Sequence, residues 1–70
     1  MKAEKFRELE SKELRSRLQE INEELLRLRF QLSLGQVEAL KKYRLLKKDR
    51  ARVLTILRER ELAAAREGAN

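Results

Sequence analysis

The chain has 70 residues, no cysteine, no histidine and no proline, and a formal net charge of +6 at pH 7. This length allows one small domain at most, and the missing residue types exclude disulfides, the usual zinc sites and the commonest general acid–base catalyst. Because no serine has a histidine partner and no glycine-rich phosphate loop is present, we expect no enzymatic activity, no cofactor, no metal and no small-molecule substrate. No apolar run approaches the roughly 18 residues that a bilayer crossing needs. We therefore expect no membrane contact and a cytoplasmic location.

Residues 1–10 are predicted to form a short helix, because Ala3, Phe6 and Leu9 recur at three-residue spacing. Ser11 follows at the place where the next helix needs a side-chain acceptor for its free N–H groups. The sequence therefore predicts that Ser11 is the N-cap of the following helix.

Residues 12–34 are predicted to form the first arm of a hairpin. Their main apolar residues are spaced alternately four and three apart, which is typical of a coiled-coil seam; they are Leu14, Leu18, Ile21, Leu25, Leu28 and Leu32. Gly35 follows at the position where a left-handed residue often ends a helix. Three further apolar residues, Leu26, Phe30 and Leu34, lie away from this seam. They are predicted either to pack against the short N-terminal helix or the turn, or to contact RNA or a neighbouring protein.

The second arm is predicted over residues 38–65, after a turn at residues 35–37 and before a frayed tail at residues 66–70. Its seam is less regular and comprises Tyr43, Leu46, Arg50, Val53 and Leu57. Two seams of similar length joined by a short loop fold back on each other. The sequence therefore predicts a single all-α domain, an antiparallel two-helix hairpin with a short N-terminal helix. A parallel dimer of one continuous helix is the alternative, which Gly35 in the middle disfavours.

Three residues of the second arm do not fit a simple two-helix pattern. Arg50 interrupts the seam, and we expect its stem to pack in the hairpin while its guanidinium reaches an edge near Glu23 or Glu24; contact with RNA is the alternative. Leu45 and Ile56 fall outside the seam and are candidates for a small protein-binding patch.

Nearly all of the excess positive charge lies in the second arm. Residues 35–60 carry nine basic and three acidic side chains, whereas residues 1–34 carry eight and seven. At 100° per residue, one group of cations falls opposite the seam; it comprises Lys41, Arg44, Lys48 and Arg52, flanked by Lys42 and Lys47. A solvated helix face usually mixes both signs of charge. Since few acids accompany these cations, we interpret the face as a phosphate-binding surface and keep an ordinary solvated face as the alternative.

Three motifs stand out near the turn and in the second arm. The first is Leu28, Arg29, Phe30 and Gln31, the second is Gly35 and Gln36, and the third is residues 47–59, Lys-Lys-Asp-Arg-Ala-Arg-Val-Leu-Thr-Ile-Leu-Arg-Glu. Together they resemble the ribosomal protein twenty-nine family of the large subunit. The resemblance covers roughly residues 3–62. Two positions depart from the family pattern: residues 37–39 read Val-Glu-Ala where helix starters such as Asn and Pro are frequent, and Arg50 stands where an aliphatic residue is preferred.

The resemblance implies a helical hairpin in the ribosome that binds large-subunit rRNA near the mouth of the peptide exit tunnel. It implies ribosomal protein twenty-three as a neighbour, with nascent-chain targeting and folding factors docking close by. By the same resemblance, Arg29, Gln31 and Gln36 belong to the hairpin tip. The basic RNA-facing arm would include Arg44, Lys47, Lys48 and Arg52.

Two other functions compete with RNA binding. A free coiled-coil adaptor would bind a partner helix through its seams, and the basic arm would then only increase solubility. A basic-zipper DNA-binding protein is a weaker alternative, because such proteins place the basic region before a long uninterrupted heptad run, whereas Gly35 interrupts this chain.

Overall fold

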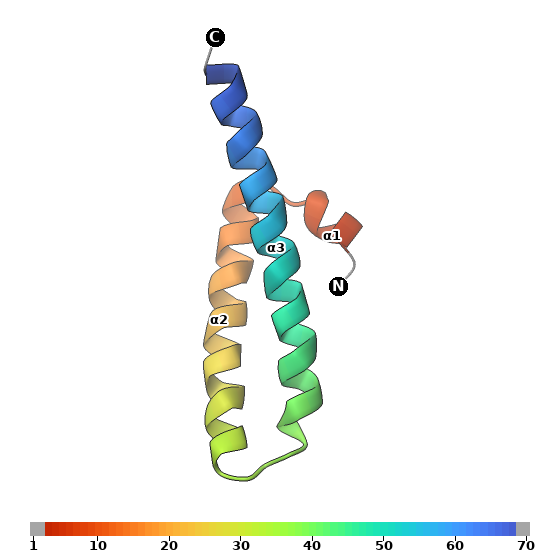
Figure 1. Ribbon diagram of the computed structural model, residues 1–70, viewed down its shortest axis with the longest axis vertical. Helices are drawn as coiled ribbons and strands as arrows, with labels where there is room; N and C mark the ends of the chain where they lie inside the picture. Colours follow the sequence, from red (N-terminus) through yellow and green to blue (C-terminus); the bar gives the residue numbers. More distant parts are fainter. Residues whose placement is uncertain (1–2, 69–70) are drawn as a thin grey trace.

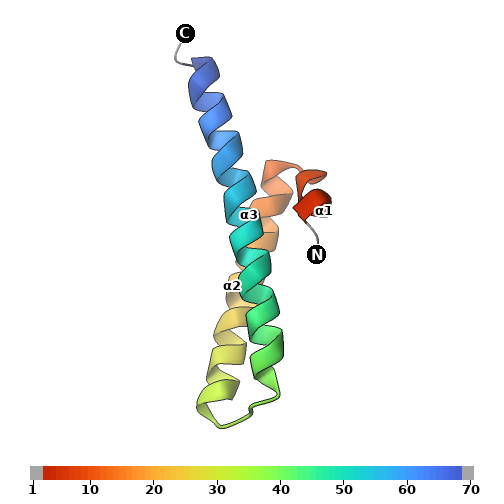
Figure 2. The same cartoon turned by 45° about the vertical axis from the view of Figure 1, so that its right-hand side comes forward.

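The computed structural model describes residues 3–68, which form three helices: α1 (Ala3–Arg7), α2 (Ser11–Ser33) and α3 (Ala39–Gly68). The two long helices run antiparallel, and α1 lies beside the middle of α3, near the start of α2, while the last turns of α3 project beyond it (Figures 1 and 2). The molecule is a rod of 54 × 19 × 15 Å. No strand occurs within residues 3–68, so the predicted all-α hairpin with a short N-terminal helix is confirmed.

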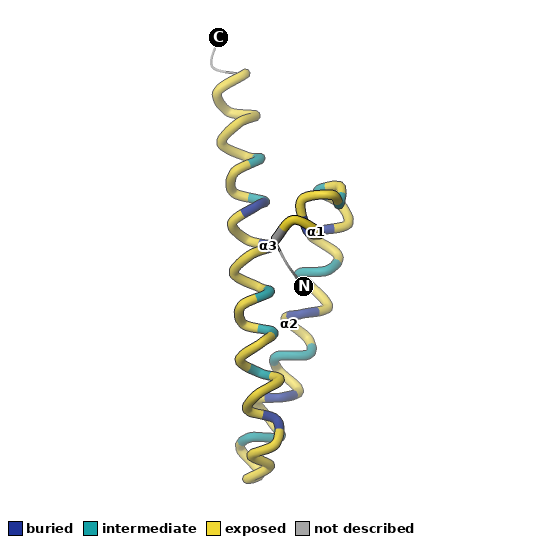
Figure 3. The backbone as a smooth tube through the Cα atoms, turned by 90° about the vertical axis from the view of Figure 1, so that its right-hand side faces the viewer, coloured by how far each residue is buried: buried dark blue, intermediate teal, exposed yellow. Residues whose placement is uncertain are grey.

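The predicted seam of α2 faces α3 along its whole length. Leu14, Ile21 and Leu28 are buried, and the alternate seam residues Leu18 and Leu25 are half-buried. Figure 3 shows these covered positions on the sides of α2 and α3 that face each other. The alternating four and three spacing keeps one narrow stripe turned inward, and burial of this stripe holds the rod together.

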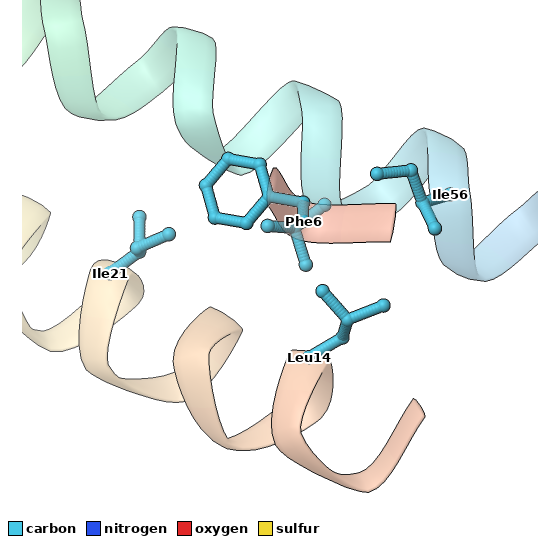
Figure 4. Close-up of a cluster of buried hydrophobic side chains, with 5 residues drawn as sticks. Phe6, Leu14, Ile21 and Ile56 are labelled. Carbon is cyan, nitrogen blue, oxygen red and sulfur yellow. The ribbon is translucent and has the colours of Figure 1, made fainter. Parts of the chain in front are cut away.

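The buried side of α3 is wider than the predicted seam. Val53 is fully buried as expected, but Ile56 is also buried, with 3% of its surface exposed. The prediction that Ile56 belongs to an exposed protein-binding patch is therefore wrong. The reason is α1, whose Phe6 is completely buried and packs with Ile56, Leu14 and Ile21 (Figure 4).

A second set of contacts fixes α1 and the α1–α2 link to α3. The guanidinium of Arg60 donates to Ser11 Oγ (3.1 Å), to the carbonyl oxygen of Arg7 (3.1 Å) and to the carbonyl oxygen of Leu9 (2.8 Å). Glu59 forms an ion pair with Arg7 (3.5 Å). A cation at the last carbonyl groups of α1 satisfies acceptors that a helix end leaves free. We call this arrangement around Arg60 the α1 clasp.

The start of α2 differs from the prediction. The N-cap is Glu10, which makes no side-chain cap hydrogen bond, and Ser11 is the first residue of the helix. The prediction that Ser11 caps α2 is wrong because its hydroxyl accepts a hydrogen bond from Arg60 instead.

The end of α2 is as predicted. Gly35 has φ +84°, a conformation that glycine adopts without strain. The N–H of Gln36 bonds to the carbonyl of Gln31 (3.1 Å), and the N–H of Gly35 bonds to that of Leu32 (3.0 Å). These two bonds are the Schellman pattern that satisfies the last carbonyl groups of a helix.

The boundaries of the other elements differ from the prediction by a few residues. α3 starts at Ala39 and continues to Gly68, three residues past the predicted end, because no helix breaker precedes that glycine. The last part of the predicted frayed tail, residues 69–70, lies outside the described residues, as do residues 1–2. α1 ends at Arg7, where the chain turns toward α2. Within residues 3–68, no helix combines the length and apolar character that a bilayer crossing requires.

Candidate nucleic-acid interface

The basic face of α3 points away from α2. Lys41, Arg44, Lys48 and Arg52 are all exposed, and the three- and four-residue steps between them place them on one side of the helix, opposite the seam. At 1.5 Å per residue the row is about 16 Å long. We call these four residues the basic stripe.

The charges of the stripe are only partly compensated by the protein. Arg52 Nη1 lies 3.7 Å from Asp49 Oδ1, one turn earlier on the same helix. Asp49 is thus one of the few acids beside the stripe, and it compensates the charge of Arg52. Within the part of the chain that the structure describes, Lys41, Arg44 and Lys48 form no ion pair. Three of the four charges of the stripe thus remain without an acidic partner among residues 3–68.

One edge of the hairpin neutralises its own cations. Lys42 Nζ lies 3.6 Å from Glu24 Oε1, and Arg27 Nη1 lies 3.3 Å from Glu24 Oε2. Gln31 and Gln36, both predicted RNA contacts, line the same hollow as Lys42. Lys42 therefore belongs to this paired edge of the hairpin. The sequence pattern predicted it as a free cation flanking the stripe, but its charge is paired with Glu24.

The opposite edge holds three cations between α2 and α3. Arg29, Lys47 and Arg50 line one shallow hollow of about 230 Å³ with Tyr43 and Asn22. Lys47 Nζ lies 5.6 Å from the centre of the Tyr43 ring, within cation–π range. Arg50 Nε donates to Asn22 Oδ1 (2.9 Å).

The predicted partners of Arg50 are wrong. Glu24 is engaged with Lys42 and Arg27 on the paired edge, and Glu23 lines hollows on the outer side of α2. Asn22, which the sequence reading missed, is the partner. Its place one residue after the seam residue Ile21 is the signal that could have identified it.

The surplus apolar residues of α2 are open to solvent. Leu26, Phe30 and Leu34 are 71%, 64% and 62% exposed. The prediction that they pack against α1 or the turn is wrong, because α1 docks on α3 beside the start of α2, away from these residues. We call these three residues the apolar ridge. Leu45 is also exposed, but with Ile56 buried the two do not form a common patch.

Comparison with known proteins gives one consistent family. The sequence model described as "Ribosomal L29 protein" matches residues 4–60. The large ribosomal subunit protein uL29 of Solibacter usitatus is 52% identical over 67 residues, which cover 96% of this chain and 100% of that protein. The protein of the same name from Geobacillus stearothermophilus is 50% identical over 91% of this chain and 97% of its own length. That of Corynebacterium glutamicum is 52% identical over 86% of this chain and 79% of its own length.

Proposed function

Because this chain belongs to the ribosomal L29 protein family, we propose that it binds large-subunit rRNA through the basic stripe of α3. The family consists of structural constituents of the large ribosomal subunit and has no enzymatic activity. The protein is accordingly a component of the ribosome, in the cytoplasm.

The observation that supports RNA binding is that three of the four cations of the stripe have no acidic partner within the described residues. Like charges on successive helix turns repel one another, and nothing in the described chain offsets Lys41, Arg44 and Lys48. Phosphate groups remove this repulsion, and each contact releases counterions from the RNA. A straight row of cations on a rigid helix suits the regular backbone of an RNA duplex better than its base edges. We therefore expect recognition of RNA shape and backbone.

A salt titration of rRNA binding tests this proposal. The stripe variant carries three substitutions, Lys41→Gln, Arg44→Gln and Lys48→Gln. It lacks three phosphate contacts, so the slope of log affinity against log salt concentration should fall in magnitude by about 2–3 units. The matched control is Lys12→Gln, Arg17→Gln and Arg27→Gln, which removes the same charge from α2, where Arg17 and Arg27 already pair with acids. A stripe variant with the slope of this control would refute the proposal.

The finer assignments come from the family resemblance and remain proposals. We place the hairpin beside ribosomal protein twenty-three near the peptide exit tunnel, and the exposed apolar ridge on α2 supports a protein neighbour there. We also propose RNA contacts for five residues outside the stripe, and the proposal for the stripe holds without them; they are Lys42, Lys47, Arg29, Gln31 and Gln36. The adaptor alternative has less support, because the two seams are buried against each other and neither is free for a partner helix.

A further inference from the structure

The edge of the hairpin near the turn combines a basic hollow with an apolar ridge. The hollow lies between the long helices and is lined by Leu26, Arg29, Tyr43, Lys47 and Arg50. Leu26 also lines the neighbouring surface hollow that contains Phe30, so the two surfaces are continuous. We call the combined surface the tip groove.

The hollow between the helices, one part of the tip groove, has no acidic residue in its lining. Of the described residues that line the hollow between the helices, three are cations and none is acidic. Arg50 bonds to the neutral amide of Asn22, and Lys47 lies over the Tyr43 ring. The paired edge on the other side of the rod differs, because there Glu24 serves both Lys42 and Arg27. Glu23 lines only the neighbouring hollow with Leu26 and Phe30, so the hollow between the helices can accept negative charge from outside the chain.

The apolar part of the tip groove favours a protein as the source of that charge. Leu26 and Phe30 are 71% and 64% exposed and stand one turn apart on α2. Phosphates neutralise cations but cannot cover leucine and phenylalanine side chains, whereas the apolar stripe of a helix can. A third helix lying along the edge of two packed helices would bury the ridge and bring its own flanking residues to Arg29 and Lys47.

We infer that the tip groove seats an amphipathic helix of a protein partner that carries carboxylates beside its apolar stripe. The inference extends the proposal that the apolar ridge meets a protein neighbour, and it names the chemistry of that neighbour. Leu26 and Phe30 anchor the partner, and the carboxylates meet Arg29 and Lys47. Those two cations thereby gain a protein partner in place of the predicted phosphates.

The test uses the full chain and two synthetic helices of roughly 15 residues, the length at which isolated helices become stable. Both probes have the same leucine stripe; one has glutamates beside it and the other has glutamines at the same positions. Fluorescence anisotropy should show that the glutamate probe binds roughly tenfold more tightly, since two partly exposed ion pairs contribute about that factor. Equal binding of the two probes, or no binding of the glutamate probe, would overturn the inference.

Substitution of the anchors separates this surface from the RNA-binding stripe. Leu26→Gln with Phe30→Gln should weaken the glutamate probe at least roughly tenfold and leave the rRNA titration unchanged. Both side chains are exposed, so the helical content measured by circular dichroism should be retained. The control, Leu54→Gln with Leu62→Gln, changes two exposed leucines of α3 that line a different hollow and should have little effect on the probe. If the anchor variant instead loses rRNA affinity, the groove binds RNA and the inference is wrong. If the stripe variant keeps the salt slope of its control while the glutamate probe binds as expected, the RNA proposal is refuted and this inference is not.

Discussion

Replacing Arg60 should release α1 from the rest of the rod. Its guanidinium makes three hydrogen bonds, to Ser11 Oγ and to the carbonyl oxygens of Arg7 and Leu9, at 2.8–3.1 Å. These bonds join α3 to the last turn of α1 and to the start of α2. In Arg60→Gln the shorter, neutral side chain reaches at most one of the three acceptors.

The expected cost follows from these contacts. A hydrogen bond from a charged donor contributes about 1.5 kcal/mol at the lower end of its range, and Arg60 is half-buried, which reduces this value. Loss of two such bonds should therefore favour detachment of α1 by about 2 kcal/mol, which raises the population of the state with α1 detached roughly 30-fold. Phe6 leaves the core when α1 detaches, so the open state exposes Ile56 and Leu14.

Amide hydrogen exchange measures this opening directly. The N–H of Leu9 donates to the carbonyl oxygen of Phe6 (3.1 Å) and is exposed to exchange when α1 unwinds. Its exchange should accelerate roughly 30-fold in Arg60→Gln and should stay near the wild-type rate in Arg58→Gln, an exposed arginine two residues away. Equal exchange rates in the two variants would refute the role assigned to the clasp.

Two stability measurements test the turn and the corrected core. Gly35→Ala should lower the free energy of unfolding by about 1 kcal/mol, because φ +84° strains any L side chain, although no atom lies within 4 Å of the added Cβ; an unchanged urea midpoint would contradict this. Ile56→Ala should cost about 2–4 kcal/mol, as expected for a buried residue, whereas Leu45→Ala at a 54% exposed position should cost less than about 0.5 kcal/mol. Similar thermal shifts for these two variants would show that α1 does not cover Ile56.

The hairpin was predictable because local signals agreed along its length. The four and three spacing in α2 defined which side faces inward, and only Gly35 interrupts the chain between the two arms. A glycine at the end of the first seam favours folding the second seam back rather than forming one continuous helix in a parallel dimer. The packing of α1 on α3 had no such local signal in the sequence. Periodicity indicates the face that α3 buries against α2, but it does not show that a distant segment, α1, covers another face of α3. Ile56 and Ser11 were misassigned for that reason.

The candidate site was predictable to the level of helix faces. Exposure of the basic stripe follows from the 100° geometry of α3 and is as expected. The partners of individual cations were not predictable, because they depend on distances across the hairpin. Glu24 lies within reach of Lys42 only after α2 and α3 have packed, and Asn22 reaches Arg50 for the same reason.

The sequence separation of the clasp contacts suggests an order in which the rod closes. Its bonds to Ser11 and Arg7 join residues 49 and 53 positions apart, whereas the Asn22–Arg50 bond nearer the turn spans 28. Closing a longer loop costs more chain entropy. The contacts between α2 and α3 should therefore form first next to Gly35 and the contacts of α1 last. We expect fraying to follow the reverse order, so that α1 leaves first. Lys41, Arg44 and Lys48 sit close to the turn, in the half of the rod that comes apart last, and so they keep their spacing while the far end opens.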